Sequence, residues 1–487
     1  MKKSKKIDLG DFQTPIPLTD RICRYISSKG FKPQILIEPT CGMGNFVFSA
    51  IKYFPTLKLV YCVELQPKYK DIFFHKLEKL RKDLTLEIEF HVDNIFTHQF
   101  SERFKALLQN PNEHILIIGN PPWVTNSEIA RLGGNNLPSK SNLKKLKGID
   151  ALMGKSNFDI TEYIIIHLLK RFDSFRGKIG MLCKLSTAVN LLKYINVLNL
   201  NISNIQFLTI DSKQEFDINV KSGLFLADLG KKEIPACEVR DLYTDKKINL
   251  FGWIDSKFVA NFELYEKYKF LEGNFPFEWR QGIKHDASKV LILKRTGRGL
   301  VNSYGEKVEV ETEFLYPFLK GSRIRKPQVN DTDYFIIVTQ KYPSDDTSYL
   351  VKYPKLWNYL TSHADLFDKR KSKMFKRRFS IFGVGDYAFK PYKVAIAGFY
   401  KEPLFTLVSP INGKPVFLDD TTYYISFNSY KEAEEVWKLL NSSEIKNFLK
   451  AISFIDSKRP YTKEILKRID LSQLNSKYKT DTQLCLL

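Results

Sequence analysis

Seven short apolar segments alternate with helical patterns over the first 240 of the 487 residues. Parallel strands need a crossover connection, which is usually a helix. This alternation therefore predicts an α/β fold with a mostly parallel, doubly wound sheet. The predicted strands are Gln34–Ile37, Leu59–Val63, Glu87–His91, Ile115–Ile118, Lys178–Cys183, Ile205–Ile210 and Gly223–Asp228.

The alternation stops near residue 240, where turn residues become frequent and basic clusters appear. We therefore expect two domains, residues 1–240 with the seven-stranded sheet and residues 241–487 with a mixed α+β fold. The chain has 76 Lys and Arg against 54 Asp and Glu, which is a net charge of +22. Such an excess of positive charge favours a polyanionic partner, and nucleic acid is the first candidate.

The composition disfavours several classes of protein. The six cysteines form no CxxC pair and the seven histidines are dispersed, so neither a disulfide scaffold nor a metal site is predicted. The first ten residues are basic and lack an apolar segment, and the most apolar run, 163–169, is too short to span a bilayer. We expect a cytoplasmic protein with no membrane partner.

A glycine turn joins the first predicted strand to a helix, and residues 38–46 read Glu-Pro-Thr-Cys-Gly-Met-Gly-Asn-Phe. Glycines let a backbone approach a ligand, and the free amides at a helix start can face it. Strand, glycine turn and helix therefore form a nucleotide-binding pattern. The third glycine of the dinucleotide fingerprint is missing, which weakens a pyrophosphate interpretation.

Acidic residues end the next two predicted strands. Glu64 follows the glycines by about twenty residues, a spacing at which a carboxylate can accept hydrogen bonds from both hydroxyls of a ribose. Asp93 ends the third strand, where it can accept from an exocyclic amino group while Ile95 or Phe96 covers an adenine face. Ligands of open α/β sheets bind at the carboxyl ends of the strands, so these features predict one nucleoside site.

The fourth predicted strand runs into Gly-Asn-Pro-Pro-Trp at residues 119–123. Proline fixes φ and donates no backbone hydrogen bond, so this turn is rigid, and its carbonyls and the Asn120 side-chain oxygen are fixed acceptors. Trp123 offers a flat face beside them. The arrangement suits a planar ring with an amino group, whose hydrogens are accepted while the indole stacks on the ring.

Together these motifs resemble the amino-methylating DNA methyltransferases, specifically the gamma class of N6-adenine enzymes in type II restriction–modification systems. The cofactor motif comes first and the basic region last, which is the order of that class. The resemblance covers residues 11–230, about half of the chain. It implies a Rossmann-like catalytic domain, S-adenosylmethionine as cofactor, flipping of an adenine out of double-stranded DNA, and a DNA target-recognition domain in the second half.

The resemblance also suggests roles for individual residues. Asn120, Pro121, Pro122 and Trp123 look like the catalytic tetrapeptide, whose aromatic residue is Tyr or Phe in many relatives. Phe216 fits the position of an aromatic that stacks on the flipped base, with a core phenylalanine as the alternative. The residues that look like cofactor-binding ones are Phe12, Thr14, Pro15, Glu38, Pro39, Cys41, Gly42, Gly44, Phe46, Glu64, Asp93, Asn94 and Ile95.

Basic clusters are the expected contacts to DNA. Phosphate contacts supply affinity and register, and a few side chains that reach base edges supply specificity. Residues 126–155 form a long Gly-, Asn- and Lys-containing loop that we expect to order over the DNA backbone. The candidates are Lys144 and Lys145 in this loop and Lys284, Arg323, Arg325, Lys326, Arg377, Arg378, Lys458 and Arg459 in the second half.

Several alternatives stay open. Asn-Pro-Pro-aromatic also occurs in enzymes that methylate a protein glutamine, the substrate could be RNA, and a DNA-binding protein could keep a methyltransferase-like fold without turnover. Cytosine N4 enzymes use a related tetrapeptide, usually with Ser first, so adenine is favoured. The resemblance further implies a cognate restriction endonuclease as a partner. Methylation of one strand at a time is compatible with a monomer, which we expect.

Overall fold

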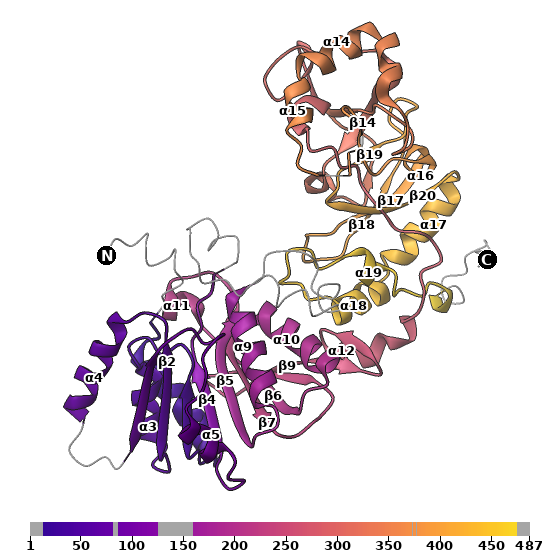
Figure 1. Ribbon diagram of the computed structural model, residues 1–487. Helices are drawn as coiled ribbons and strands as arrows, with labels where there is room; N and C mark the ends of the chain where they lie inside the picture. The colour runs from indigo at the N-terminus through magenta and orange to yellow at the C-terminus, as the bar shows by residue number, and fades with distance from the viewer. Residues whose placement is uncertain (1–12, 81–85, 125–158, 373, 376, 475–487) are drawn as a thin grey trace. The chain divides into compact units, whose positions relative to one another are not determined.

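The structure is a computed structural model, and it describes residues 13–80, 86–124, 159–372, 374–375 and 377–474. The chain forms two compact units, Met1–Phe262 and Glu263–Leu487. The first unit is an α/β sheet flanked by helices (Figure 1). Its elements in chain order are α2 (Ile16–Ser28), β1 (Ile35–Glu38), α3 (Asn45–Tyr53), β2 (Leu59–Glu64), α4 (Lys68–Leu80), β3 (Glu87–Val92), α5 (Glu102–Leu108), β4 (Ile115–Gly119), α9 (Ile160–Phe172), β5 (Gly177–Lys184), α10 (Leu185–Leu198), β6 (Ile202–Ile210), α11 (Ser212–Phe216), β7 (Ser222–Leu229), β8 (Ala236–Asp241), β9 (Lys247–Ile254) and β10 (Lys257–Val259).

All seven predicted strands are present, as β1 to β7, with bounds within three residues of those expected. The sheet has ten strands in the order β10-β9-β8-β6-β7-β5-β4-β1-β2-β3. β3, β2, β1, β4 and β5 are mutually parallel, whereas β7 runs antiparallel between β5 and β6. β8, β9 and β10 extend the sheet beyond β6, so the first unit continues to Phe262 instead of ending near residue 240.

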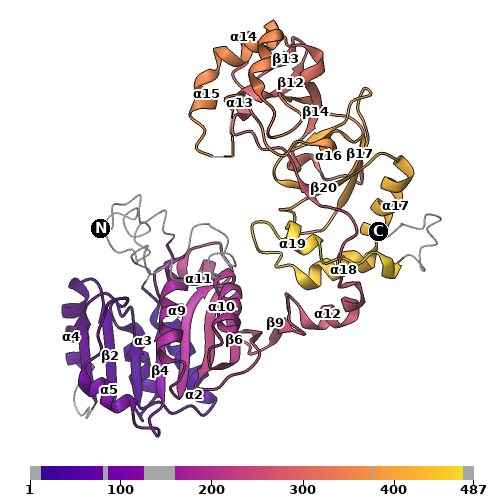
Figure 2. The same cartoon turned by 45° about the vertical axis from the view of Figure 1, so that its right-hand side comes forward.

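Helices cover both faces of this sheet. Leu36, Val60 and Leu116 share one core cluster with residues of α2, α3 and α4. On the other face of β2, the Tyr61 ring contacts Phe104 of α5 at 4.5 Å between ring centroids, and α9 and α10 lie side by side (Figures 1 and 2). Because both faces are covered, β1, β2 and β4 are buried along their whole length, and they are continuously apolar apart from their terminal residues.

The second unit contains two five-stranded sheets, in the orders β11-β20-β17-β18-β15 and β13-β12-β16-β14-β19, and thus has the expected mixed α+β fold. Its elements in chain order, with α12 spanning the junction, are α12 (Phe262–Tyr268), η1 (Lys269–Leu271), β11 (Arg280–Gln281), α13 (Ser288–Leu291), β12 (Ile292–Thr296), β13 (Gly299–Val301), η2 (Thr312–Phe314), β14 (Leu315–Leu319), η3 (Gly321–Arg323), β15 (Gln328–Val329), β16 (Tyr334–Ile337), η4 (Thr347–Lys352), α14 (Pro354–Ser362), α15 (Ala364–Asp368), α16 (Asp386–Phe389), β17 (Tyr392–Ala397), β18 (Phe405–Val408), β19 (Phe417–Leu418), β20 (Thr422–Phe427), α17 (Tyr430–Leu440), α18 (Ser443–Ile452) and α19 (Lys463–Leu466).

Across the described ranges, no helix is long and apolar enough to cross a membrane. In the same part of the chain, no three or more His, Cys, Asp or Glu side chains are grouped so that they could hold a metal ion. The cysteines that the structure describes are buried free thiols, namely Cys23, Cys41, Cys62, Cys183 and Cys237.

Candidate active site

The carboxyl ends of β1, β2, β3 and β4 lie at one edge of the sheet, because these strands are mutually parallel. Glu38 is the last residue of β1 and Glu64 is the last of β2, while Asp93 follows β3 and Asn120 follows β4. From the strand order, the four residues end neighbouring strands in the sequence Asn120, Glu38, Glu64 and Asp93. The side chains singled out from the sequence therefore share one edge.

The glycine turn after β1 has a backbone that only glycine accommodates well. Gly42 has a φ of +52° and Gly44 a φ of +77°. A Cβ at Gly42 would lie 2.7 Å from the Gln13 side chain, and a Cβ at Gly44 would overlap the ring of Phe73, which is fully buried. The turn is thus packed tightly on both sides, and its backbone can face a ligand only in this conformation.

The segment before α2 lies against this turn. Gln13 Oε1 accepts a hydrogen bond from the backbone N–H of Met43 at 3.1 Å, and Asn45 Nδ2 donates to the carbonyl of Thr14 at 2.8 Å. Of the predicted cofactor residues before α2, Thr14 therefore contacts the turn through its backbone, and Phe12 lies outside the described residues. Gln13 lies between them in the sequence, although no role was predicted for its side chain.

The acidic groups at the edge differ in environment. The Glu64 carboxylate accepts from the backbone N–H groups of Gly42 at 2.7 Å and Gln66 at 2.8 Å, which hold it beside the glycine turn. Burial raises the pKa of the Glu38 carboxyl well above its ordinary value, against the opposing effect of hydrogen bonds from the Cys41 thiol and the backbone of Val47. Glu38 is therefore favoured in its protonated form.

In the segment from the end of β1 into the glycine turn, Glu38 Oε2 and Thr40 Oγ1 are buried oxygens with no hydrogen-bond partner among the described residues. Buried polar atoms are nearly always paired, so such atoms mark places that a polar ligand can occupy. The two oxygens belong to the residues on either side of Pro39. The donor and acceptor set of this turn fits the polar end of an amino-acid-bearing nucleoside.

Three predicted cofactor residues have side chains in the core. Cys41 is 3%, Phe46 1% and Ile95 5% exposed, which leaves their backbone atoms as the groups that can face a ligand. Phe96 is half-buried, with its ring edge-to-face against His167, so it is the more accessible of the two residues expected to cover an adenine.

The Asn-Pro-Pro-Trp turn is held from behind by α9. Thr161 Oγ1 donates to the Pro122 carbonyl at 2.8 Å, and the Ile160 N–H donates to the Val124 carbonyl at 3.0 Å. Thr161 is 1% exposed, so this contact is shielded from water. Sequence reasoning missed Thr161, because it lies 39 residues from its partner and no local pattern signals the pairing.

Trp123 and Phe216 meet edge-to-face, with ring centroids 5.4 Å apart and planes at 61°. Phe216 ends α11, which follows β6, and both rings are half-buried against the core. The structure therefore brings the two aromatic residues expected to stack on a base into contact with each other. The indole nitrogen of Trp123 is buried and has no hydrogen-bond partner among the described residues.

Glu162, in the first turn of α9, gives a pH-dependent stability. Burial raises the pKa of its carboxyl to about 7 from 4.5, partly offset by the Asn190 amide, which donates to Glu162 Oε2 at 3.0 Å. The unfolded chain releases this proton near pH 4.5 and the folded chain near pH 7. Stability therefore falls as pH rises through that window, by about 3 kcal/mol in total.

We expect Glu162→Gln to remove this loss, because the amide keeps the acceptor for Asn190 and stays neutral. Relative to the wild type, the variant should become more stable as the pH rises from 5 to 7 and show no further gain above about pH 7.5. Urea denaturation across this pH range measures the difference. A constant difference in unfolding free energy at every pH would contradict the assignment.

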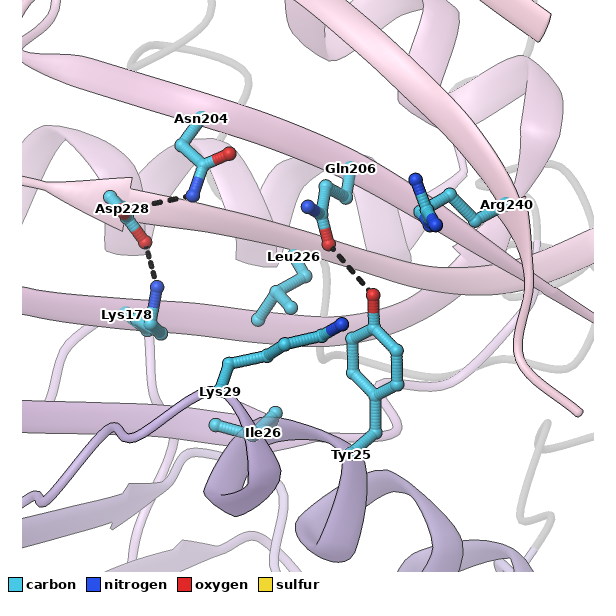
Figure 3. Close-up of a pocket in the computed structure, with 9 residues that line it drawn as sticks. All are labelled: Tyr25, Ile26, Lys29, Lys178, Asn204, Gln206, Leu226, Asp228 and Arg240. Carbon is cyan, nitrogen blue, oxygen red and sulfur yellow. Dashed lines mark hydrogen bonds and ion pairs between the residues drawn. The ribbon is translucent and has the colours of Figure 1, made fainter. Parts of the chain in front are cut away.

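A separate pocket of about 290 Å³ lies on the α2 face of the sheet, near β5, β6, β7 and β8 (Figure 3). Its charged side chains pair with acidic groups: Lys178 with Asp228, and both Lys29 and Arg240 with Asp245. Lys178 and Asp228 lie at the amino end of β5, away from the edge that carries Asn120. With its charges satisfied internally, this pocket carries no clear ligand preference.

The predicted DNA contacts of the second unit differ in how far their charge is already used. Arg378 is ion-paired with Asp368, and Arg325 donates to the Tyr400 hydroxyl. Arg459 donates to the Asp420 carbonyl at 3.4 Å. Lys284 is half-buried, and Lys144 and Lys145 lie outside the described residues. The remaining predicted contacts are exposed, namely Arg323, Lys326, Arg377 and Lys458.

Arg370 lies in the basic run at residues 369–378 and ties that run to the segment after β11. Its half-buried guanidinium donates to the carbonyl of His285 at 3.2 Å and to that of Ser380 at 2.6 Å. A cation whose donors are directed at backbone carbonyls stabilises loop structure and has little left for a phosphate. Its further acceptors are the carbonyls of Phe367, Arg377 and Arg378.

No protein-family model matches the chain. Over 480 residues it is 38% identical to the type II methyltransferase M.NspV of Nostoc sp., an alignment that covers 96% of this chain and 97% of that protein. The chain belongs to the type II DNA methyltransferase family. S-adenosylmethionine is accordingly the cofactor of this methyltransferase.

Other similarities to the methyltransferase are more limited. It is 29% identical to the type II methyltransferase M.CvrRI of Paramecium bursaria Chlorella virus XZ-6E over 125 residues, 26% of this chain and 27% of that one. The methyltransferase subunit of a type I restriction–modification system from Streptococcus thermophilus aligns with a TM-score of 0.36 at 12% identity. That alignment covers 53% of this chain and 57% of the other.

Proposed function

We propose that this type II methyltransferase belongs to the gamma class and methylates N6 of one adenine in a specific duplex sequence. The observation that carries the proposal is the Asn-Pro-Pro-Trp turn after β4, beside the glycine turn that follows β1. A rigid set of acceptors next to the glycine turn suits the transfer of a methyl group to an exocyclic amine. A first residue of Asn in the tetrapeptide favours adenine over cytosine N4.

In this proposal the cofactor lies along the carboxyl edge of β1, β2 and β3. The glycine turn and Glu38 hold its amino-acid end, Glu64 accepts from its ribose hydroxyls, and Asp93 accepts from its adenine amino group. When bound, S-adenosylmethionine supplies an electrophilic methyl group on a positively charged sulfur. The protein residues orient this end of the site and exclude water from it.

The target adenine is proposed to enter between the tetrapeptide and Phe216. Asn120 Oδ1 and the Pro121 carbonyl accept the two amino hydrogens, which aligns the amine and offsets the positive charge that it develops. Trp123 and Phe216 supply ring faces for the extruded base. The support is the contact between these two rings and the fixing of the turn by Thr161.

The second compact unit, Glu263–Leu487, is proposed to recognise the DNA target, and a cognate endonuclease is proposed to cut the same site. In this unit, exposed cations come from the segments 321–326, 369–378 and 458–459. Arg370 ties the middle segment to the loop after β11 through its hydrogen bonds to the carbonyls of His285 and Ser380. Pre-ordered loops suit sequence recognition because less conformational entropy is lost on binding.

Transfer of labelled methyl groups tests the class of substrate. We expect label from S-adenosylmethionine to appear in mixed-sequence duplex DNA, and not in RNA or in protein under the same conditions. Label in RNA or in a protein glutamine, with none in DNA, would overturn the proposal. Binding of S-adenosylhomocysteine and DNA without any transfer would favour a binding-only protein.

Two exposed lysines give a salt-dependence prediction. Lys326 and Lys458 make no ion pair with another described residue. If both contact phosphates, Lys326→Ala and Lys458→Ala each weaken binding to all duplex sequences. Each also reduces the slope of log affinity against log salt concentration by about 1.

Fluorescence anisotropy with mixed-sequence duplexes at several salt concentrations measures this slope. Lys438→Ala is the matched control, because Lys438 is ion-paired with Glu434 on α17 of the same unit. We expect the control to keep the wild-type slope. An equal change in all three variants would show only a general loss of charge.

A further inference from the structure

We propose that His98, anchored by Tyr61, is a positioning residue that fixes the Asp93 carboxylate so that the site selects the adenine of its cofactor. The inference rests on the proposed function, in which Asp93 accepts from the adenine amino group. It adds two residues, from β2 and from the turn after β3, that no motif of the sequence singled out.

The chain of contacts begins at a half-exposed carboxylate and ends in the core. Asp93 has 45% of its side chain exposed, and its Oδ2 lies 2.7 Å from His98 Nδ1. A carboxylate only accepts, so Nδ1 carries the hydrogen. His98 is 4% exposed, and its Nε2 lies 2.7 Å from the hydroxyl of the fully buried Tyr61.

The next partner in the chain is the Tyr61 hydroxyl, which also accepts from the backbone N–H of Ser101 at 3.4 Å. This hydroxyl can donate its own hydrogen to His98 Nε2 while His98 Nδ1 donates to Asp93. The hydrogen bond from His98 is the main reason that the pKa of the Asp93 carboxyl lies below its ordinary value, so Asp93 stays an ionised acceptor.

The imidazole is also fixed by its backbone. The His98 N–H donates to the Asn94 carbonyl at 2.9 Å, and Arg171 Nη1 donates to the His98 carbonyl at 3.0 Å. Arg171 in turn lies over the Phe100 ring, 3.9 Å from its centroid. His98 therefore has little freedom to rotate, and the carboxylate that it holds keeps one orientation toward the strand edge.

An ionised, oriented acceptor distinguishes purines by the group on carbon 6. It attracts the amino group of adenine and repels the carbonyl oxygen of hypoxanthine. Replacing a residue that only packs in the core would change the affinity for both ligands by the same factor. The discrimination between the two bases is therefore the quantity that a positioning role changes and a purely structural role does not.

The test compares binding of S-adenosylhomocysteine and S-inosylhomocysteine to the full chain by calorimetry. We expect His98→Leu to weaken S-adenosylhomocysteine about tenfold and to leave S-inosylhomocysteine within about twofold of wild type. His98→Asn retains an N–H donor and should recover most of the loss. Tyr61→Phe, which removes only the hydroxyl, should weaken S-adenosylhomocysteine to a smaller extent.

Adding His98→Leu to Asp93→Ala should cause no further loss, because the residue acts through the carboxylate. Equal weakening of both ligands, or none, would overturn the inference. If His98→Leu does not fold, Tyr61→Phe decides it through the same ratio of affinities, with His98→Asn as the variant that should keep the wild-type ratio. Failure of Asp93→Ala itself to reduce the discrimination would instead overturn the proposed role of Asp93.

Discussion

Asn120→Ala should lower the rate of methyl transfer at saturating cofactor and DNA by about a hundredfold to a thousandfold. The side-chain oxygen of Asn120 is proposed to accept from the target amine and to offset its developing positive charge. Asn120 follows β4 in a turn whose next two residues are prolines, and Thr161 holds that turn from α9.

The rate is measured in single turnover, so that product release does not mask the chemical step. Binding of S-adenosylhomocysteine should remain within about twofold of wild type, because the cofactor is proposed to lie on β1, β2 and β3. Asn112→Ala is the control, since Asn112 is exposed in the loop before β4. A variant that kept more than a tenth of the wild-type rate would contradict the assigned role.

Gly44→Ala should cost about 3 kcal/mol of stability and at least about tenfold in cofactor affinity. The residue combines a φ of +77° with a site where a Cβ overlaps the Phe73 ring. The left-handed conformation costs an alanine about 1–2 kcal/mol, and the overlap adds overpacking of a fully buried ring. Relief of either strain moves the glycine turn, and this movement displaces the backbone amides that are proposed to face the cofactor.

Gly30→Ala separates the two causes. Gly30 follows α2 with nearly the same φ, +78°, but a Cβ added there would have no atom within 4 Å. We expect it to lose only about 1–2 kcal/mol and no cofactor affinity. Denaturation measures the stability of both variants, and calorimetry measures their affinity for S-adenosylhomocysteine. Equal effects of the two substitutions would show that the contact with Phe73 does not help to hold the glycine turn in place.

The parallel part of the sheet was predictable because its strands are buried on both faces and read as continuous apolar runs. β1, β2 and β4 are the clearest cases. The turn residues that follow such runs could be placed at one edge without any structure, because parallel strands end together. For this reason the glycine turn, Glu64 and Asp93 could be expected at one edge, whereas the order of the strands along that edge emerged only from the structure.

The last three strands could not be foreseen in the same way. β9 is half-exposed over most of its length and β10 has three residues, so neither reads as a buried run. β8 pairs with β6 in parallel, and β9 and β10 then extend the sheet past β8 by antiparallel pairing, which moves the end of the first unit to Phe262. Composition alone marked the change in texture near residue 240 but not the strands beyond it.

Contacts between distant residues were also hidden from the sequence. Tyr61 and His98 are 37 positions apart, and Thr161 and Pro122 are 39 apart. Their pairing depends on the register of β2 with β3 and on where α9 begins. Local motifs therefore identified the groups proposed to touch the cofactor and the base, whereas the residues that hold those groups in place emerged only from the fold.

The identity of the methylated nucleoside decides whether this methyltransferase modifies N6 of adenine. Duplex DNA labelled by the wild-type methyltransferase would be digested to nucleosides, and the labelled product identified by mass spectrometry. We expect N6-methyladenine at one repeated sequence from the wild type, and none from Asn120→Ala. N4-methylcytosine as the labelled product, or label that persists at the wild-type level in Asn120→Ala, would contradict this expectation.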